Sequence, residues 1–224
     1  MSNSPGLNEG ATDQVQSWSD VKRWVHRDLV QRGAIKPGAS LGLGVLLRHP
    51  INMFMFLLRA KEWTVNARVP AIIRLSVAVM FRRQSMRLGF SIPPNTFGPG
   101  LAIVHYGPIV VNGNARIGAN CRTHVCVNIG GGGGLVDPKA AHGLAPVLGD
   151  NIYIGPGAKI FGTIRIADRC VIGANAVVNS SFEKPGCSIA GVPARVISDK
   201  GSEGMVLDSS MSPVTNDRQT GATA

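Results

Sequence analysis

The 224-residue sequence is poor in aromatic side chains and has no long uninterrupted apolar run. Aromatic residues make up 5% of the chain and hydrophobic residues 44%, which favours a core of stacked aliphatic side chains over one built on large rings. A membrane-spanning helix needs about 20 uninterrupted apolar residues. The apolar stretches 41–58 and 69–81 are shorter and are interrupted by arginine or proline. We therefore expect one domain of ordinary size with a small helical addition.

The four cysteines form no C-x-x-C pair, and the 28 glycines and 14 prolines follow no collagen period. The glycines and prolines therefore act as turn residues. Cys170 falls on a small inner position of the repeat described below, so we expect it to be packed and reduced. We recognise no secretory signal in the first residues and expect a cytoplasmic protein.

Acidic residues are missing between Glu62 and Asp137, although the formal net charge of the whole chain is +10. A basic balance suits nucleic acid, a membrane surface or anionic small molecules, and does not choose among them. No aromatic platform or recognised motif accompanies the charge, so we expect no nucleic-acid partner. Weak contact of the helical N-terminal region with a membrane surface stays open.

The N-terminal part of the chain has helical patterns. Residues 1–16 are polar and are predicted to be disordered, whereas residues 17–89 form the predicted helical region. In this region, Ser19 is expected to cap the first helix and Gly33 to end it. Further helices are expected to start at Pro50 and Pro70, because proline suits a first helical turn.

From residue 90 an aliphatic residue returns at every sixth position. A six-residue period does not match the 3.6 residues per turn of an α-helix. It suits short strands separated by turns, where glycine is favoured. The main series are Phe97, Ile103 and Ile109; Val111, Ile117, Thr123 and Ile129; and Leu148, Ile154, Ile160, Ile166, Ile172 and Val178. Three sixes make one triangular turn, so residues 90–198 predict a prism of about four coils, interrupted at 130–146. Residues 199–224 are predicted to be a disordered tail.

This period, closed by "AGVPARVI" (190–197), resembles the left-handed parallel β-helix of the hexapeptide-repeat acyltransferases. Within that superfamily, "GPGLAIVHYGPIVVNGNARIGANC" (98–121), a Gly-rich break ending in a histidine, and "GDNIYIGPGAKIFGTIRI" (149–166) are similar to the serine acetyltransferase branch. "WSDVKRWVHRDL" resembles its helical preface, so the likeness covers roughly 17–198. The resemblance implies a mainly β fold, an enzyme that uses acetyl-CoA as co-substrate without a metal, and a homotrimer with sites between subunits.

Acetyl transfer from a thioester to a hydroxyl needs a base, oxyanion donors and aligned substrates. Histidine is the natural base near neutral pH. The resemblance implies that His105, after the strand "LAIV", is catalytic and that His142, at the end of the loop, contacts the acceptor. His26 and His49 are expected to be solvated, and His124 to face out of the prism.

The glycines 130–134 do not form a phosphate loop, because no Gly-Lys-Ser/Thr follows them. The resemblance places Gly131 and Gly132 beside the pantetheine arm of the cofactor. It also points to Pro156 and Ala174 along that arm, and to Pro193 and Arg195 near the nucleotide. Turn geometry alone is an alternative explanation for all of these residues.

The sequence departs from the branch at its acidic positions. The aspartate found about one coil before the catalytic histidine is missing, and Ala141 stands where an arginine precedes the loop histidine. A backbone carbonyl or Asp137 is then needed to orient His105. These departures predict a carbohydrate acceptor, such as a hydroxyl of an exopolysaccharide or capsule sugar. The alternatives are a serine O-acetyltransferase of cysteine biosynthesis, a non-catalytic trimeric scaffold, and a zinc hydratase, for which the histidines are too far apart in sequence.

Overall fold

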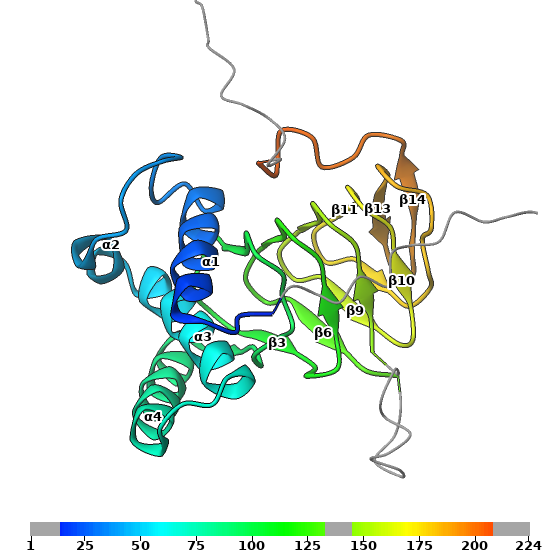
Figure 1. Cartoon of the computed structure of the whole chain (residues 1–224). Coiled ribbons are helices and arrows are strands. Elements are labelled where there is room, and N and C mark those ends of the chain that lie inside the picture. The colour runs from blue at the N-terminus through cyan, green and yellow to red at the C-terminus, as the bar shows by residue number, and fades with distance from the viewer. Residues whose placement is uncertain (1–13, 133–144, 208–224) are drawn as a thin grey trace, which may run out of the picture.

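The protein consists of a helical region followed by a prism of short parallel strands (Figure 1). The computed structural model describes residues 14–132 and 145–207. The helices are α1 (Trp18–Gln31), α2 (Leu43–Arg48), α3 (Pro50–Asn66) and α4 (Ala71–Leu88). The strands are β1 (Phe90–Ser91), β2 (Ala102–Ile103), β3 (Ile109–Val111), β4 (Arg116–Ile117), β5 (Arg122–Thr123), β6 (Asn128–Gly130), β7 (Val147–Leu148), β8 (Tyr153–Ile154), β9 (Lys159–Phe161), β10 (Arg165–Ile166), β11 (Val171–Ile172), β12 (Val177–Val178), β13 (Ser188–Gly191) and β14 (Ala194–Ser198). The predicted order, helices first and repeated strands after, is confirmed.

Three sheets form the walls of the prism. Sheet A has the order β1-β3-β6-β9-β12, sheet B the order β10-β7-β4, and sheet C the order β14-β13-β11-β8-β5-β2. Ile154 pairs in parallel with Ile172 on the next turn of the chain, which is the spacing that three six-residue units require. The hairpin of β13 and β14 is the antiparallel exception and ends sheet C.

The inside of the prism is filled by the repeating aliphatic residues. In sheet C, one inward column contains Ile103, Thr123, Ile154, Ile172 and Ile189, and each member pairs with the next. All five are fully buried. The inward positions two residues before those of the last series are buried as well, and they are Ile152, Ala158, Ile164, Cys170 and Ala176. Hydrophobic burial along these columns therefore stabilises each turn against its neighbours.

Turn glycines and turn asparagines have different tasks in the prism. Asn120, Asn151 and Asn175 adopt left-handed conformations with φ of 57°, 56° and 54°, a region that asparagine tolerates. Gly155 has another reason to be glycine, because a Cβ there would lie 2.7 Å from the backbone nitrogen of Ala174. Close approach of successive turns, more than backbone conformation, selects such glycines.

The helices begin and end close to their predicted positions. The cap of α1 is Ser17 and not Ser19, because Ser17 forms a reciprocal capping box with Asp20. Pro50 occupies the first turn of α3 as expected, and Gly89 ends α4 in a left-handed conformation with φ of 76°. Helix α2 was not predicted, because its six residues are too few to show a periodic pattern.

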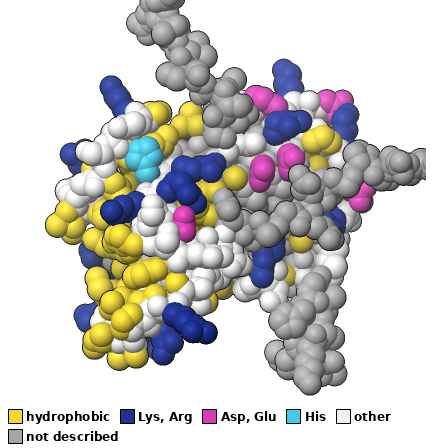
Figure 2. All heavy atoms as spheres, in the orientation of Figure 1, with side chains coloured by type: hydrophobic (Ala, Val, Ile, Leu, Met, Phe, Trp, Pro, Cys, Tyr) yellow, Lys and Arg dark blue, Asp and Glu magenta, His cyan; other side chains and the backbone are white. Residues whose placement is uncertain are grey.

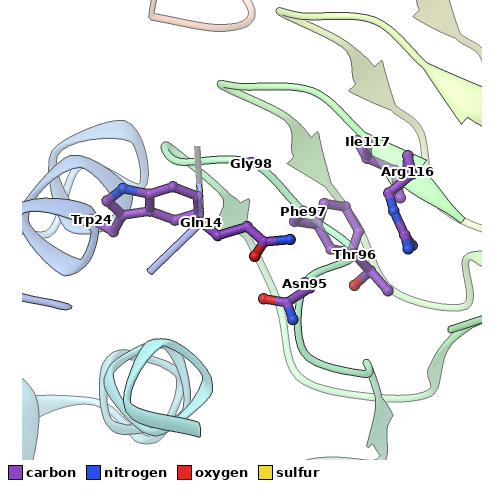
Figure 3. Close-up of a pocket in the computed structure, with 8 residues that line it drawn as sticks. All are labelled: Gln14, Trp24, Asn95, Thr96, Phe97, Gly98, Arg116 and Ile117. Atoms are coloured by element: carbon purple, nitrogen blue, oxygen red, sulfur yellow. The ribbon is translucent and has the colours of Figure 1, made fainter. Parts of the chain in front are cut away.

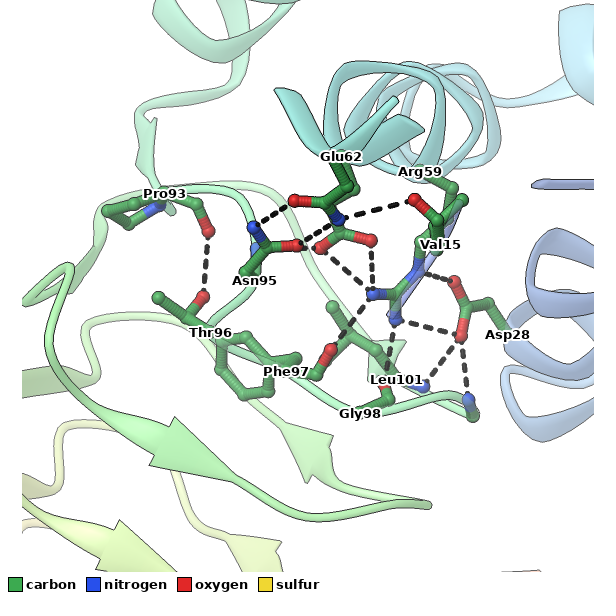
Figure 4. A network of polar contacts seen from close by, with 12 residues as sticks. Val15, Asp28, Arg59, Glu62, Pro93, Asn95, Thr96, Phe97, Gly98 and Leu101 are labelled. Atoms are coloured by element: carbon green, nitrogen blue, oxygen red, sulfur yellow. Dashed lines mark hydrogen bonds and ion pairs between the residues drawn. The ribbon is translucent and has the colours of Figure 1, made fainter. Parts of the chain in front are cut away.

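A buried ion network joins the helical region to the first turn of the prism (Figure 4). Arg59 is fully buried, and its guanidinium lies 2.7 Å from the carboxylate of Asp28 and 3.0 Å from that of Glu62. Burial lowers the pKa of Arg59, but the two carboxylates outweigh burial and hold the pKa above its ordinary value. Arg59 therefore stays charged at neutral pH, whereas burial raises the pKa of Glu62 above its ordinary value.

The described part of the predicted disordered tail, residues 199–207, packs against the prism. The hydroxyl of Ser202 donates to the carbonyl of Asn151, and the amide of Ser202 donates to the carbonyl of Arg169. Val206 is buried. Residues 1–13 and 208–224, which the sequence also assigns to disorder, lie outside the described residues. Among the described helices, none has the length and apolarity that a bilayer crossing requires.

Candidate functional site

One edge of the prism, where sheet C turns into sheet A, collects several of the predicted site residues. His105, Pro156 and Ala174 each stand two positions after the last residue of a sheet C strand, and Val125 fills the turn between the first two. Hydrogen bonds connect neighbouring turns, from the amide of Gly157 to Val125 O at 2.9 Å and from that of Asn175 to Pro156 O at 2.9 Å. At about 4.8 Å per strand, His105 and Ala174 lie roughly 14 Å apart along this edge.

The His105 side chain is exposed at the helical end of the edge. Its ring centroid lies 6.1 Å from that of His124, which in turn lies 5.1 Å from that of Tyr153. A general base needs access to its substrate and a ring that can accept a proton. The exposed position of His105 provides that access.

His124 is half-buried beside His105, so the expectation that it simply faces outward was incomplete. Its Nε2 atom is buried and has no hydrogen-bond partner among the described residues. Burial lowers the pKa of His124, and the nearby Arg122 and His105 lower it further. His124 is therefore neutral at physiological pH and has an unused ring nitrogen beside the exposed histidine.

Arg32, the C-cap residue of α1, contacts the strand that precedes His105. Its Nε donates to the carbonyl of Ile103 at 3.0 Å, one guanidinium nitrogen donates to Asn52 Oδ1 at 2.9 Å, and the other lies 3.2 Å from His49 Nδ1. No sequence pattern predicts this arrangement, because the partners are far apart in the chain and share no motif.

Two histidines that were expected to be solvated have structural partners instead. His49 caps α3 through the amide of Ile51 and contacts Arg32, and its pKa is lowered by burial and then by the arginine charge. His26 pairs through Nε2 with the carbonyl of Ala39 at 3.0 Å. The expectation of simple solvation was therefore wrong, because segments distant in sequence fold onto both rings.

The predicted glycines lie on a different edge from His105. Gly131 and Gly132 follow β6, at the far side of sheet A from the His105 edge. A Cβ at Gly132 would lie 2.8 Å from the Cα of Gly162, so packing of adjacent turns already favours glycine there. His142, Ala141 and Asp137 lie outside the described residues.

Pro193 and Arg195 lie in the hairpin of β13 and β14, at the end of the prism away from the helices (Figure 1). Both are exposed. The guanidinium of Arg195 donates to its neighbouring carbonyl, Ala194 O, at 2.8 Å and makes no ion pair with a described carboxylate. Its charge is thus available to an anion at this end.

A pocket lies between α1 and the first turns of the prism, away from the His105 edge (Figure 3). None of the predicted site residues lines it. Its lining residues are Gln14, Trp24, Asn95, Thr96, Phe97, Gly98, Arg116 and Ile117. Within residues 14–132 and 145–207, no three His, Cys, Asp or Glu side chains gather closely enough to hold a metal ion.

The sequence is similar to those of serine acetyltransferases. It is 32% identical over 178 residues to the enzyme from Synechococcus elongatus, covering 79% of this chain and 69% of the relative. It is 31% identical over 162 residues to the enzyme from Mycobacterium tuberculosis, covering 72% and 66%. The chain thus spans about two thirds of the length of these relatives. No family model matches it.

Solved structures of serine acetyltransferases superpose on this chain. The serine acetyltransferase of Neisseria gonorrhoeae superposes with a TM-score of 0.59 at 25% identity, covering 80% of this chain and 66% of that one. The enzyme of Brucella abortus in complex with coenzyme A superposes with a TM-score of 0.60 at 25% identity, covering 82% and 69%.

These relatives contradict the expected carbohydrate acceptor, since the relatives and structures compared are serine acetyltransferases. They favour the serine alternative, and an enzyme over a scaffold. Missing acids between residues 63 and 136 were a poor guide to the acceptor, because a site at an edge of the prism draws on other segments too. Asp137, the first acid after that stretch, lies outside the described residues.

Proposed function

The chain belongs to the serine acetyltransferase family, and we propose that it transfers the acetyl group of acetyl-CoA to the hydroxyl of serine. The product, O-acetylserine, feeds cysteine biosynthesis. The observation that carries this proposal is the match over 178 residues, which spans both the helical region and the prism. The exposed ring of His105 on the edge of the prism supplies a group suited to the chemistry.

In the proposed reaction, His105 acts as the general base. It accepts the proton of the serine hydroxyl while that oxygen bonds to the thioester carbonyl carbon. When the tetrahedral intermediate collapses, the carbon–sulfur bond breaks and the imidazolium of His105 returns the proton to the CoA thiolate. No acyl-enzyme is needed, because the thioester is already activated. His142, the predicted acceptor contact, belongs to this part of the proposal.

His124 is the proposed positioning partner of His105. The residue immediately before His105 is Val104, whose apolar side chain cannot orient the histidine ring. The buried carboxylates of Asp28 and Glu62 are already engaged by Arg59. A neutral ring with an unpartnered buried nitrogen supports a role beside a base that becomes an imidazolium. Through a bridging water, His124 would orient the His105 ring and stabilise its charged form.

Acetyl-CoA is proposed to lie along the prism from His105 toward the β13–β14 hairpin. Pro156 and Ala174 border the pantetheine arm on the His105 edge. Gly131 and Gly132, the other predicted contacts, lie at the far side of sheet A, so one subunit alone does not bring them to the same arm. The exposed guanidinium of Arg195, next to Pro193, suits the phosphates of the nucleotide. The run of roughly 14 Å from His105 to Ala174 suits an extended arm.

The remaining architecture is part of the same proposal. Residues 90–198 form the acyltransferase domain, a left-handed β-helix of about four coils, and residues 17–89 form its helical region. We propose a homotrimer, because His105 stands on an open edge and a neighbouring subunit would supply the wall that a water-excluding site needs.

The test is thiol release from acetyl-CoA by the full chain, with serine, threonine, simple sugars, sugar nucleotides and oligosaccharides as acceptors. We expect kcat/KM for serine to exceed that for every carbohydrate by about tenfold or more. A carbohydrate with a higher kcat/KM than serine would refute the serine proposal. Absence of thiol release with every acceptor, in folded protein that binds acetyl-CoA, would also count against it.

A further inference from the structure

Helix α4 packs on the rest of the protein with one side only. Phe81 stacks on Phe54 of α3 with ring centroids 5.6 Å apart, and the amide of Gln84 donates to the carbonyl of Pro50 at 2.8 Å. Leu88 is the buried residue of the helix. The side that carries Phe81, Gln84 and Leu88 therefore faces α3, and the opposite side faces outward.

The outward side is rich in large apolar residues. Ile72, Leu75, Val79 and Met86 recur at three-, four- and seven-residue steps, which places them along one stripe of the helix. Their exposed fractions are 71%, 62%, 48% and 72%. With 18 residues, α4 extends about 27 Å. Figure 2 shows hydrophobic side chains gathered at the corner of the molecule that α4 occupies.

Cationic side chains accompany this stripe. Arg82, Arg83 and Arg87 are exposed and lie within one turn of Val79 or Met86. Arg74 is exposed too, but it lies to the side of the stripe. None of these four makes an ion pair with a described carboxylate. No acidic residue occurs from 63 to 136, so the whole helix is uniformly basic. Figure 2 shows the arginine and lysine side chains beside the hydrophobic ones at this corner.

From this combination we infer that α4 docks the protein on the surface of an anionic lipid bilayer. The stripe of Ile72, Leu75, Val79 and Met86 enters the boundary between head groups and acyl chains, while the arginines pair with lipid phosphates and carboxylates. Because no described helix could cross a membrane, the contact is peripheral. This inference is independent of which acceptor the enzyme acetylates.

Two other occupants fit the helix less well. A two-fold contact with a second copy would press two positively charged helices together, without an acid on either helix to neutralise the charge. Nucleic acid would satisfy the arginines but leave the apolar stripe in contact with phosphate and water. An anionic bilayer satisfies both the apolar and the cationic side chains.

The experiment is flotation of the full chain with vesicles of phosphatidylcholine alone or with about 30% phosphatidylserine. We expect binding to the anionic vesicles, little binding to the neutral ones, and weakening by salt. Ile72→Gln with Met86→Gln should lower the partition coefficient about tenfold, and Arg83→Gln with Arg87→Gln by a similar factor. All four side chains are exposed, so these variants should fold, as circular dichroism can verify.

Matched controls carry the same changes on other surfaces. Val192→Gln with Ile197→Gln removes equally exposed apolar residues from the β13–β14 hairpin, and Arg165→Gln removes an exposed arginine from sheet B. These variants should bind as the wild type does. Failure of the wild type to float with anionic vesicles at low salt would overturn the inference, as would equal losses in the controls.

Two further results would replace the bilayer by another partner. One is an oligomer, seen by light scattering, that dissociates in the Ile72→Gln and Met86→Gln variant while the wild type binds no vesicles. The other is binding to duplex DNA that only the arginine variant loses. Either result would assign the face to a second copy or to nucleic acid, respectively, and would reject the lipid surface.

Discussion

The prism and the helical region bury different kinds of side chain. Inside the prism the inward columns are mostly aliphatic, and the departures include Phe97, Thr123 and three buried cysteines, Cys121, Cys170 and Cys187. The helical region buries Arg59 with Asp28 and Glu62. In the prism each turn of the chain covers the next, so strand amides find carbonyl partners one turn away, as Gly155 N does at Ile172 O and Gly173 N at Ile189 O.

The two regions bury different side chains because the first turn of the prism lies against the helical region. The first turn of the prism has no preceding turn, so its peptide groups need other partners. Arg59 donates to the carbonyls of Phe97 and Gly98 at 2.9 and 2.8 Å. Asp28 accepts from the amides of Gly100 and Leu101 at 2.7 and 2.9 Å. A repeat can be closed by charged side chains as well as by further backbone, provided that the charges are mutually paired.

The largest expected effect concerns chemistry on the prism. His105→Ala should lower kcat for acetyl transfer by a factor on the order of 10² to 10⁴, the usual contribution of a general base, because in the proposed mechanism His105 takes the hydroxyl proton. His26→Gln is the matched control, since glutamine can still donate to Ala39, and its kcat should stay within about twofold. Steady-state thiol release measures both. A folded His105→Ala enzyme with near-normal kcat would remove His105 from the role.

The second prediction compares the stability that is lost when the buried ion network or the aliphatic core of the prism is changed. Arg59→Met should lower the free energy of unfolding by about 3–5 kcal/mol, because it leaves Asp28 and Glu62 buried without a counter-charge. Ile160→Val, in the prism core, should cost only about 0.5–1.5 kcal/mol. Urea denaturation of both variants provides the values. Equal losses would mean that the ion network is no more sensitive to a missing partner than the aliphatic columns are to a missing methylene.

The third prediction concerns close approach within the prism. Gly155→Ala should destabilise the protein by about 1–3 kcal/mol, because its Cβ would lie 2.7 Å from the backbone of Ala174 and overpack two turns. Gly44→Ala is the control in the helical region, where a Cβ would meet nothing within 4 Å and alanine favours the helix. Thermal unfolding should show a lower Tm for the first variant and an unchanged or higher Tm for the second. The opposite order would contradict packing as the reason for Gly155.

The smallest effect is a pH dependence of the helical region. The folded pKa of His49 lies below its ordinary value, so its contribution is present above the unfolded pKa of about 6.5 and is lost as pH falls through the folded value. His49→Asn retains a capping side chain but cannot titrate. The variant should therefore lose less stability than the wild type between pH 7 and pH 5 in urea denaturation. An unchanged slope would show that His49 does not titrate differently in the folded state.

The sequence by itself determined the prism. Ile154, Ile160, Ile166 and Ile172 follow one another at six-residue steps, and partners one turn apart are local enough in the chain for a simple period to fix the register. Pro50 and Gly89 marked helix ends for an equally local reason. His105 could be singled out because its surroundings match a known family, not because spacing alone identifies a base.

Only the tertiary structure decided how the two regions meet. Asp28 finds Arg59, Arg32 reaches Ile103, and His124 comes to lie beside His105. These pairs join segments without a shared period, and their energies depend on burial and on distances between atoms that no local pattern encodes. The acceptor could not be predicted from missing acids for the same reason, because a binding site collects its charges in space rather than along the chain.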